Sequence, residues 1–240
     1  SVGERMRITS GGNVGIGNNN PEAYGTLIDN LVVGTTSGEN GMTIASGTSN
    51  GGRICFADNT TSPQRGMIEY AHHDDSMSIN TAGSNSVKIH SAGEVTQVRQ
   101  PFFFVRKNAD QNNITASSHT NVTFEVENFD TGSNFASNTF TAPVTGKYLL
   151  GCSILLSQPR LNADYIHIRI KTSNRDYRVL MAHYSGMDQE IDYWSVNGAF
   201  VCDMDASDTA YISFYQSGGT AQTDILEMPD TTNFYGYLLG

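Results

Sequence analysis

Residues 138–152 read Asn-Thr-Phe-Thr-Ala-Pro-Val-Thr-Gly-Lys-Tyr-Leu-Leu-Gly-Cys, and they predict two strands joined by a tight turn. Phe140 alternates with threonines, which is the period of a half-buried strand. Pro143 fixes φ at the corner, and Gly146 can take a left-handed backbone angle there. The alternate residues of the second strand then share one face: Tyr148, Leu150 and Cys152. The hairpin therefore has an inward side, and these residues with Phe140 should lie in a core.

The same stretch resembles the signature of the jelly-roll heads of complement component one-q and tumour necrosis factor. In that family a Phe-Thr-x-Pro-x-x-Gly-x-Tyr run leads into the first long core strand. The positions are occupied here by Phe140, Thr141, Pro143, Gly146 and Tyr148. The resemblance implies a trimeric head that binds a partner and catalyses no reaction.

Residues 100–240 predict about ten strands in an antiparallel two-sheet domain, because runs with the strand period are separated by turn residues and no helical period competes. The family resemblance implies that this ten-stranded β-sandwich is a jelly roll. The end of the chain, Asn233–Leu239, resembles the closing Phe-x-Gly-x-Leu-Leu strand of the family, whereas the preceding Ser217–Thr232 is longer than usual. The predicted strands are Phe102–Arg106, a short one near Ile114, Val122–Glu127, Asn138–Ala142, Tyr148–Leu156, Tyr165–Lys171, Tyr177–His183, Ile191–Cys202, Ala210–Gln216 and Phe234–Leu239.

The aromatic residues predict a domain boundary near Gln100-Pro101. The chain has 11 Tyr, 11 Phe and 1 Trp, yet only Tyr24, Phe56 and Tyr70 precede position 101. Residues 1–99 instead show short apolar alternations between Gly, Asn and Ser turns. Each such strand carries too little apolar surface for an independent layer and would leave open edges. We therefore expect an elongated trimeric β stalk in which identical chains cover one another.

A repeat supports the stalk. The run from Met6 to Val14 aligns with the run from Val87 to Val95, since apolar–basic–Ile, then Ser and Gly, then Val recur in both. The run Glu4-Arg5-Met6-Arg7-Ile8 with Gly12-Asn13-Val14-Gly15-Ile16-Gly17, and the downstream run Ile54-Cys55-Phe56-Ala57-Asp58, resemble modules of the distal shafts of tailed-bacteriophage tail fibres. This resemblance covers most of residues 3–93. Because the chain begins inside such a module, we interpret it as the C-terminal piece of a longer fibre protein with an upstream segment as partner.

Composition excludes several classes of function. The net charge is −10, from 14 basic and 24 acidic residues, which argues against binding to nucleic acid or to anionic membranes. No catalytic motif, phosphate loop or cysteine metal cluster appears, so we expect no catalytic residue, metal or cofactor. Cys55, Cys152 and Cys202 lie in apolar strand-like runs, which predicts three buried free thiols.

Three acidic or histidine-rich groups invite a chemical interpretation. His72–Asp75 could hold a metal, but the group fits a polar hairpin tip. Asp203–Asp208 could bind calcium, but the run lacks the glycine and the final glutamate of a calcium loop. Asp188, Glu190 and Asp192 alternate and could form a glycosidase pair, but they also fit the polar face of a strand.

These features together predict a virion tail-fibre protein. The homotrimeric head, at the fibre tip, would attach the phage to a glycan or protein receptor on the host cell surface. One alternative is a polysaccharide depolymerase acting at a subunit groove, and another is a purely structural trimerisation knob. The resemblance implies that the C-terminus returns to the stalk end, and alternating strand direction then places three loops at the free tip: Ser157–Ala163, Ser185–Gln189 and Ser217–Thr232. Their side chains include the predicted receptor-binding residues: Arg160, Tyr184, Met187, Asp188, Gln189, Gln222, Asp224 and Asp230.

Overall fold

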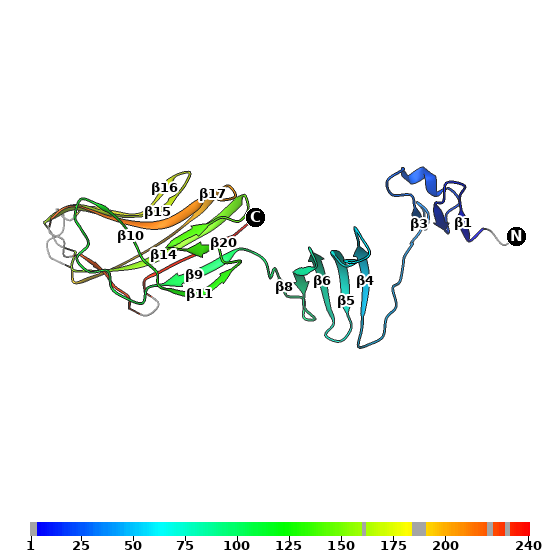
Figure 1. The fold of residues 1–240 in the computed structure, drawn as a ribbon, viewed down its shortest axis with the longest axis horizontal. Coiled ribbons are helices and arrows are strands. Elements are labelled where there is room, and N and C mark those ends of the chain that lie inside the picture. The colour runs from blue at the N-terminus through cyan, green and yellow to red at the C-terminus, as the bar shows by residue number, and fades with distance from the viewer. Residues whose placement is uncertain (1–3, 160–161, 184–190, 220–222, 229–230) are drawn as a thin grey trace. The chain divides into compact units, whose positions relative to one another are not determined.

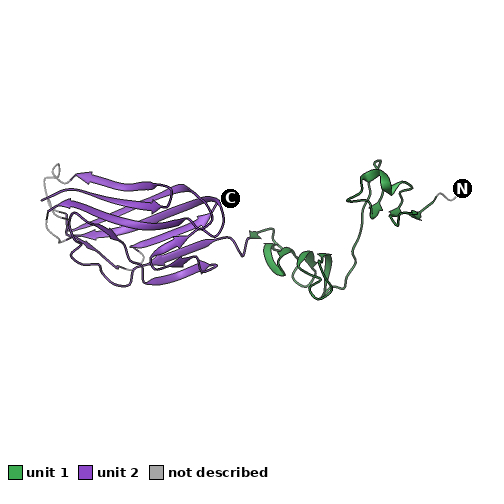
Figure 2. Ribbon diagram, turned by 45° about the horizontal axis from the view of Figure 1, so that its top comes forward, with its two compact units in different colours: residues 1–96 green, residues 97–240 purple. Residues whose placement is uncertain are grey.

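The computed structural model describes residues 4–159, 162–183, 191–219, 223–228 and 231–240. Strands dominate these residues, which also contain one short 3-10 helix, η1 (Pro21–Tyr24). The chain divides into two compact units, residues 1–96 and 97–240 (Figure 2). Each unit is described separately below. Among the described residues, no helix is long and apolar enough to cross a membrane.

Unit 1 contains two small sheets. In the first, β1 (Met6–Ile8) pairs antiparallel with β2 (Val14–Ile16), and β2 pairs parallel with β3 (Leu31–Val33). The second is an antiparallel meander in which each strand pairs with the next. Its strands are β4 (Gly51–Phe56), β5 (Gly66–Ala71), β6 (Ser76–Thr81), β7 (Ser84–Ile89) and β8 (Val95–Thr96).

The two runs of the sequence repeat in unit 1 fold into similar hairpins. Ile8 lies opposite Val14 in the β1–β2 hairpin, and Ile89 lies opposite Val95 in the β7–β8 hairpin. The turns match as well: Thr9 N donates to Asn13 O at 2.9 Å, as His90 N donates to Glu94 O at 2.9 Å. Each turn has a glycine at positive φ, +87° at Gly12 and +96° at Gly93, which only glycine adopts without strain. The repeated residues therefore encode one hairpin twice.

Unit 2 is a sandwich of two sheets (Figure 1). The β14 sheet has the order β11-β9-β20-β14-β17, with β19 also paired to β14. The β18 sheet has the order β12-β13-β18-β15-β16, with β10 also paired to β18. The strands are β9 (Phe102–Arg106), β10 (His119–Asn121), β11 (Val126–Thr131), β12 (Phe135–Ala136), β13 (Thr139–Thr141), β14 (Gly146–Ser157), β15 (Ala163–Thr172), β16 (Asp176–His183), β17 (Tyr193–Met204), β18 (Thr209–Gly218), β19 (Asp224–Ile225) and β20 (Asn233–Leu238).

The connections of unit 2 are those of a jelly roll. The chain passes from β13 in one sheet to β14 in the other and back to β15, and it crosses again from β16 to β17 to β18. The inward side chains form one core between the sheets. The predicted core residues Phe140, Tyr148, Leu150 and Phe214 are all buried, and Leu238 is partly buried against them. An all-β sandwich is thereby confirmed.

Two predicted strands of unit 2 are wrong. Ile114 lies in an irregular segment, although it is buried, and Val122–Glu125 is irregular where a strand to Glu127 was expected. Side chains take the hydrogen bonds that a strand partner would take: Gln111 Oε1 accepts from Thr123 N at 2.9 Å, and Asn138 Oδ1 accepts from Phe124 N at 2.7 Å. With the short strands β10, β12 and β19, the described part of unit 2 has more strands than the ten expected.

One of the three predicted buried thiols is also wrong. Cys152 and Cys202 are buried in the core of unit 2, and all three cysteines are free thiols. Burial raises the pKa of the Cys152 thiol to about 12. Cys55 is exposed, and it lies on β4, the edge strand of its sheet.

Candidate binding surfaces

Most of the predicted receptor-binding residues lie outside the described residues: Arg160, Tyr184, Met187, Asp188, Gln189, Gln222 and Asp230. Asp224 is described, and it is half-buried in β19. Its Oδ1 accepts a hydrogen bond from Asn113 N at 2.7 Å, so this carboxylate holds the neighbouring loop. Asp224 therefore has a structural role in the chain, and it stays only a candidate for contact with a receptor.

The two ends of the sandwich are separated by the length of β14, which has 12 residues. At one end Lys147 N donates to Gly240 O at 2.8 Å, so the C-terminus lies there. At the other end Ser157 pairs with Asp224. Asp224 consequently lies at the end of unit 2 opposite the C-terminus, whose position is marked in Figure 1.

The turn His72–Asp75 joins β5 to β6 and has a structural explanation. Asp74 accepts hydrogen bonds from Lys88 Nζ at 2.9 Å and from Ser76 Oγ at 2.7 Å. These two bonds lower the pKa of Asp74 to about 2. The carboxylate therefore anchors the turn to β7 and is ionised at neutral pH.

In the acidic turn Asp203–Asp208, a carboxylate accepts hydrogen bonds from groups of the same chain. Asp208 Oδ2 accepts from Asp205 N and from Asn174 Nδ2, both at 2.7 Å. The turn is thereby hydrogen-bonded to the β15–β16 connection, at the end of the sandwich where the C-terminus lies.

Of the predicted glycosidase carboxylates, Asp188 and Glu190 lie outside the described residues. No group of three His, Cys, Asp or Glu side chains in the described ranges is placed to hold a metal.

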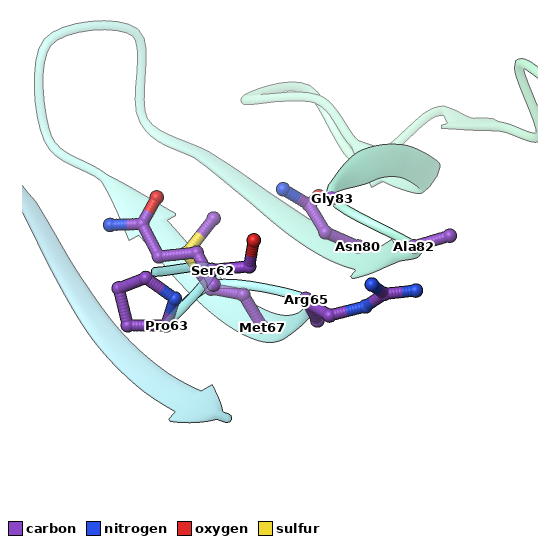
Figure 3. Close-up of a pocket in the computed structure, with 8 residues that line it drawn as sticks. Ser62, Pro63, Arg65, Met67, Asn80, Ala82 and Gly83 are labelled. Atoms are coloured by element: carbon purple, nitrogen blue, oxygen red, sulfur yellow. The ribbon is translucent and has the colours of Figure 1, made fainter. Parts of the chain in front are cut away.

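A pocket of about 450 Å³ lies beside β5 and β6 in unit 1 (Figure 3). The segment before β5 folds over Met67, which is 6% exposed, and Gly83 N donates to Arg65 O at 2.9 Å. Arg65 is the charged residue of this lining and faces Asp58 at 3.9 Å. The lining residues are Ser62, Pro63, Gln64, Arg65, Met67, Asn80, Ala82 and Gly83. The pocket lies where the segment before β5 covers Met67, and its described lining contains no pair of side chains arranged for catalysis.

One face of the β4–β8 sheet is apolar and open. The register places Ile54, Ile68 and Ile79 opposite one another on three successive strands. A second row crosses the sheet from Tyr70 through Met77, Ile89 and Val95. We call this surface the apolar stalk face: Ile54, Phe56, Ile68, Tyr70, Met77, Ile79, Val87, Ile89 and Val95. Phe56 is 59% exposed and Ile79 44% exposed, so a single chain leaves the face in water.

The opposite side of the same sheet is polar. Arg53, Glu69, Ser78 and Lys88 lie opposite one another across β4–β7. Arg53 Nε donates to Glu69 at 2.8 Å. Cys55 and Met67 also lie on this side, and the segment before β5 covers Met67. The large exposed apolar side chains of the sheet are therefore concentrated on the apolar stalk face.

A second open surface, which we call the aromatic head face, is the outer side of the β14 sheet. Phe102 stacks on Phe129 at 4.4 Å, and Phe104 lies 6.5 Å from Tyr235. Gly151 lies under the Tyr235 ring, where a Cβ would come within 2.4 Å of Cζ. The face comprises Phe102, Phe104, Phe129, Leu149, Val201, Tyr235 and Tyr237. Val201 is 57% exposed and Phe102 42% exposed, and contiguous exposed patches of this kind mark interaction sites.

Sequence reasoning expected the thin stalk strands but missed the aromatic head face. A signal was present, because Phe102, Phe104, Tyr235 and Tyr237 occupy the positions that alternate with buried Phe103 and Phe234. Both sides of these strands are apolar, which is typical of strands covered on both faces.

A scan against models of known protein families finds no match to this sequence. A search of curated proteins also finds none. Among solved structures, the globular domain of zebrafish complement 1qA protein is 18% identical, covers 59% of this chain and 98% of its own, and superposes with a TM-score of 0.42. Murine APRIL is 13% identical, with coverage of 58% and 99% and a TM-score of 0.42. Eiger TNF from S. frugiperda is 15% identical, with coverage of 59% and 94% and a TM-score of 0.42. The likeness to these proteins is one of fold alone.

Proposed function

We propose that this chain is the distal part of a tailed-bacteriophage tail fibre that forms a homotrimer and attaches the virion to a receptor on the host cell surface. Unit 1 belongs to the shaft in this proposal, and it continues from an upstream fibre segment. Unit 2 is the head that meets a glycan or an outer-surface protein. The protein catalyses no reaction.

The observation that carries the proposal is the pair of open faces, one in each unit. The apolar stalk face and the aromatic head face both expose large apolar side chains, including Phe56, Phe102 and Val201. Burial of apolar surface stabilises an assembly by roughly 25 cal/mol for each Å² removed from water. Closed symmetry among identical chains buries both faces and leaves none to promote open-ended aggregation. A trimer is the state that the sequence resemblances imply.

Attachment is supported by the architecture that the sequence resemblances imply. A head at the end of a shaft reaches the host surface first, and three copies raise the effective strength of weak contacts. The phage context rests on the resemblance of residues 3–93 to shaft modules. Labelled full chain is expected to bind saturably to cells of a susceptible bacterium and to release no oligosaccharide from their envelope. Release of oligosaccharide would favour a depolymerase instead.

The assembly can be tested by placing charges on both open faces. The double variant Ile79→Asp/Val201→Glu puts a carboxylate on each face, where desolvation on assembly would be unfavourable. The wild type is expected to have the mass of a trimer by light scattering at micromolar concentration, and the double variant the mass of a monomer. Circular dichroism checks that the strands remain.

The matched control is Ser78→Asp/Met181→Glu. Ser78 lies on the polar side of the same sheet as Ile79, and Met181 is 42% exposed on the sheet of unit 2 that does not contain Val201. This control should stay trimeric. A folded wild-type monomer, or equal masses for the two double variants, would contradict the proposal.

A further inference from the structure

The outer side of the β18 sheet differs in chemistry from the two apolar faces. Strands β10, β18, β15 and β16 lie side by side there, and the register places His119 opposite Tyr215 and Tyr215 opposite His167. Tyr165 lies opposite His183 in the next row. We call this surface the histidine–tyrosine face: His119, Tyr165, His167, His183 and Tyr215.

The five rings form a connected platform. His167 stacks on Tyr215 with centroids 4.8 Å apart and planes 12° apart, and His119 lies 4.8 Å from the same tyrosine. Tyr165 stacks on His167 at 6.0 Å and lies 5.6 Å from His183. The core does not need these rings, because the alternate residues Phe214, Ile166 and Ile168 are the ones that fill it.

Cationic side chains border the platform. Arg169 lies opposite Arg178 in the row next to His167. Arg169 Nη1 donates to Asp176 at 2.8 Å, and Lys171 lies 4.0 Å from the same carboxylate. Arg178 is exposed, and its Nη1 contacts Met181 Sδ at 3.2 Å. Two cations, Arg169 and Lys171, thus share the Asp176 carboxylate, and Arg178 borders the platform as a third cation.

Two polar atoms at the centre are unsatisfied. His167 is only 4% exposed, yet its Nδ1 has no hydrogen-bond partner among the described residues. Arg169 Nε is buried and unpartnered in the same part of the structure. Burial, together with the charge of Arg169, lowers the pKa of His167 to about 4, so the ring is neutral at physiological pH. Buried polar atoms are normally paired, which makes two unpaired ones in adjacent rows unusual.

We propose that the histidine–tyrosine face binds an acidic saccharide, a sugar ring that carries a carboxylate. The C–H side of the sugar packs on the exposed edges of the rings, and the imidazole nitrogens of exposed His119 and His183 exchange hydrogen bonds with its hydroxyls. The Arg178 guanidinium pairs with the carboxylate through charge-assisted hydrogen bonds. This inference rests on the proposed function, because it names the chemistry of the receptor. It places the receptor-binding surface on a sheet instead of on the loops at the tip.

The test compares two ligands and two arginines in the full chain. Isothermal titration uses an oligosaccharide of glucuronic acid and the same oligosaccharide with its carboxylates reduced to alcohols. Arg178→Gln removes the cation from the platform, whereas Arg175→Gln removes an exposed cation from the β15–β16 turn, outside the platform. Wild type and Arg175→Gln should bind the acidic form about tenfold or more tightly than the reduced form, and Arg178→Gln should bind the two forms alike.

A third variant tests the stacking. Tyr215→Leu should weaken both ligands, since the stacked ring serves the sugar and not the carboxylate. Equal binding of the acidic and reduced forms by the wild type, equal affinities of the two arginine variants, or equally tight binding of inorganic polyphosphate would overturn the proposal. Polyphosphate binding would show attraction to anions in general.

Cell binding separates this inference from the proposed function. If the labelled chain binds host cells and Arg178→Gln binds them as well as Arg175→Gln does, the histidine–tyrosine face does not bind the receptor. The proposal of host attachment is then retained. If the oligosaccharide distinguishes the two variants but no cell is bound, the platform stands and attachment fails.

Discussion

Replacement of Phe140 by alanine is expected to lower the free energy of unfolding of unit 2 by about 3 to 5 kcal/mol. Phe140 is 1% exposed, and its ring stacks on Phe103 at 4.7 Å and meets Tyr148 at 5.5 Å. Phe140 belongs to the β18 sheet, and Phe103 and Tyr148 belong to the β14 sheet, so side chains of both sheets contact one another here. Removing the ring leaves a cavity between two rigid layers that cannot collapse to fill it.

The measurement is chemical denaturation followed by tryptophan fluorescence or circular dichroism. Tyr193→Ala is the control, because Tyr193 is 64% exposed and its loss should change the free energy of unfolding by less than about 1 kcal/mol. If Phe140→Ala unfolds at the same denaturant concentration as the wild type, the register of the central hairpin is wrong.

Lys107→Ala is expected to destabilise unit 2 by about 3 to 5 kcal/mol, as much as a core substitution. The Lys107 side chain is 0% exposed. Its Nζ donates to Thr123 Oγ1 at 2.8 Å, to Thr123 O at 3.1 Å and to Gln111 Oε1 at 3.2 Å, with Glu125 at 3.5 Å. These contacts join the two irregular segments that follow β9 and precede β11.

Lys107→Met separates packing from charge. The methionine keeps most of the stem volume but removes the donor to Thr123 O and Thr123 Oγ1, which should cost about 1 to 3 kcal/mol, whereas Gln111 Oε1 keeps its hydrogen bond from Thr123 N. The surface control is Lys147→Met, whose ammonium pairs with Asp203 in solvent and should contribute at most about 1 kcal/mol. Equal stabilities of Lys107→Met and wild type would show that the buried ammonium is not a structural element.

The pH dependence provides a second measurement on Lys107. Burial lowers the pKa of Lys107, and the Glu125 charge only partly opposes this. The unfolded chain therefore holds the proton more tightly than the folded chain. Stability of the wild type relative to Lys107→Met should rise as the pH increases toward the ordinary lysine value of 10.5.

The sequence by itself determined the strands whose pattern is local. Phe102–Arg106 was predicted with the bounds that β9 has, and the strands around Phe140, Tyr148 and Phe214 lie where alternation placed them. Apolar alternation is enough to predict these strands, because side chains at every second position point inward and those side chains are apolar. The hairpins of unit 1 also depend on local sequence. In each, the turn glycine and the paired Ile and Val lie within ten residues of one another.

Tertiary structure alone decided the features that depend on distant partners. Val122–Glu125 has the composition of a strand, but Gln111 and Asn138 take its backbone hydrogen bonds. Cys55 has apolar neighbours in the sequence, but it is exposed on the edge strand β4. The histidine–tyrosine face combines His119, His167 and Tyr215, which are far apart in the chain and meet only through strand register. Local pattern fixes which residues share a face of a strand, whereas long-range pairing fixes which strands are neighbours and what covers each face.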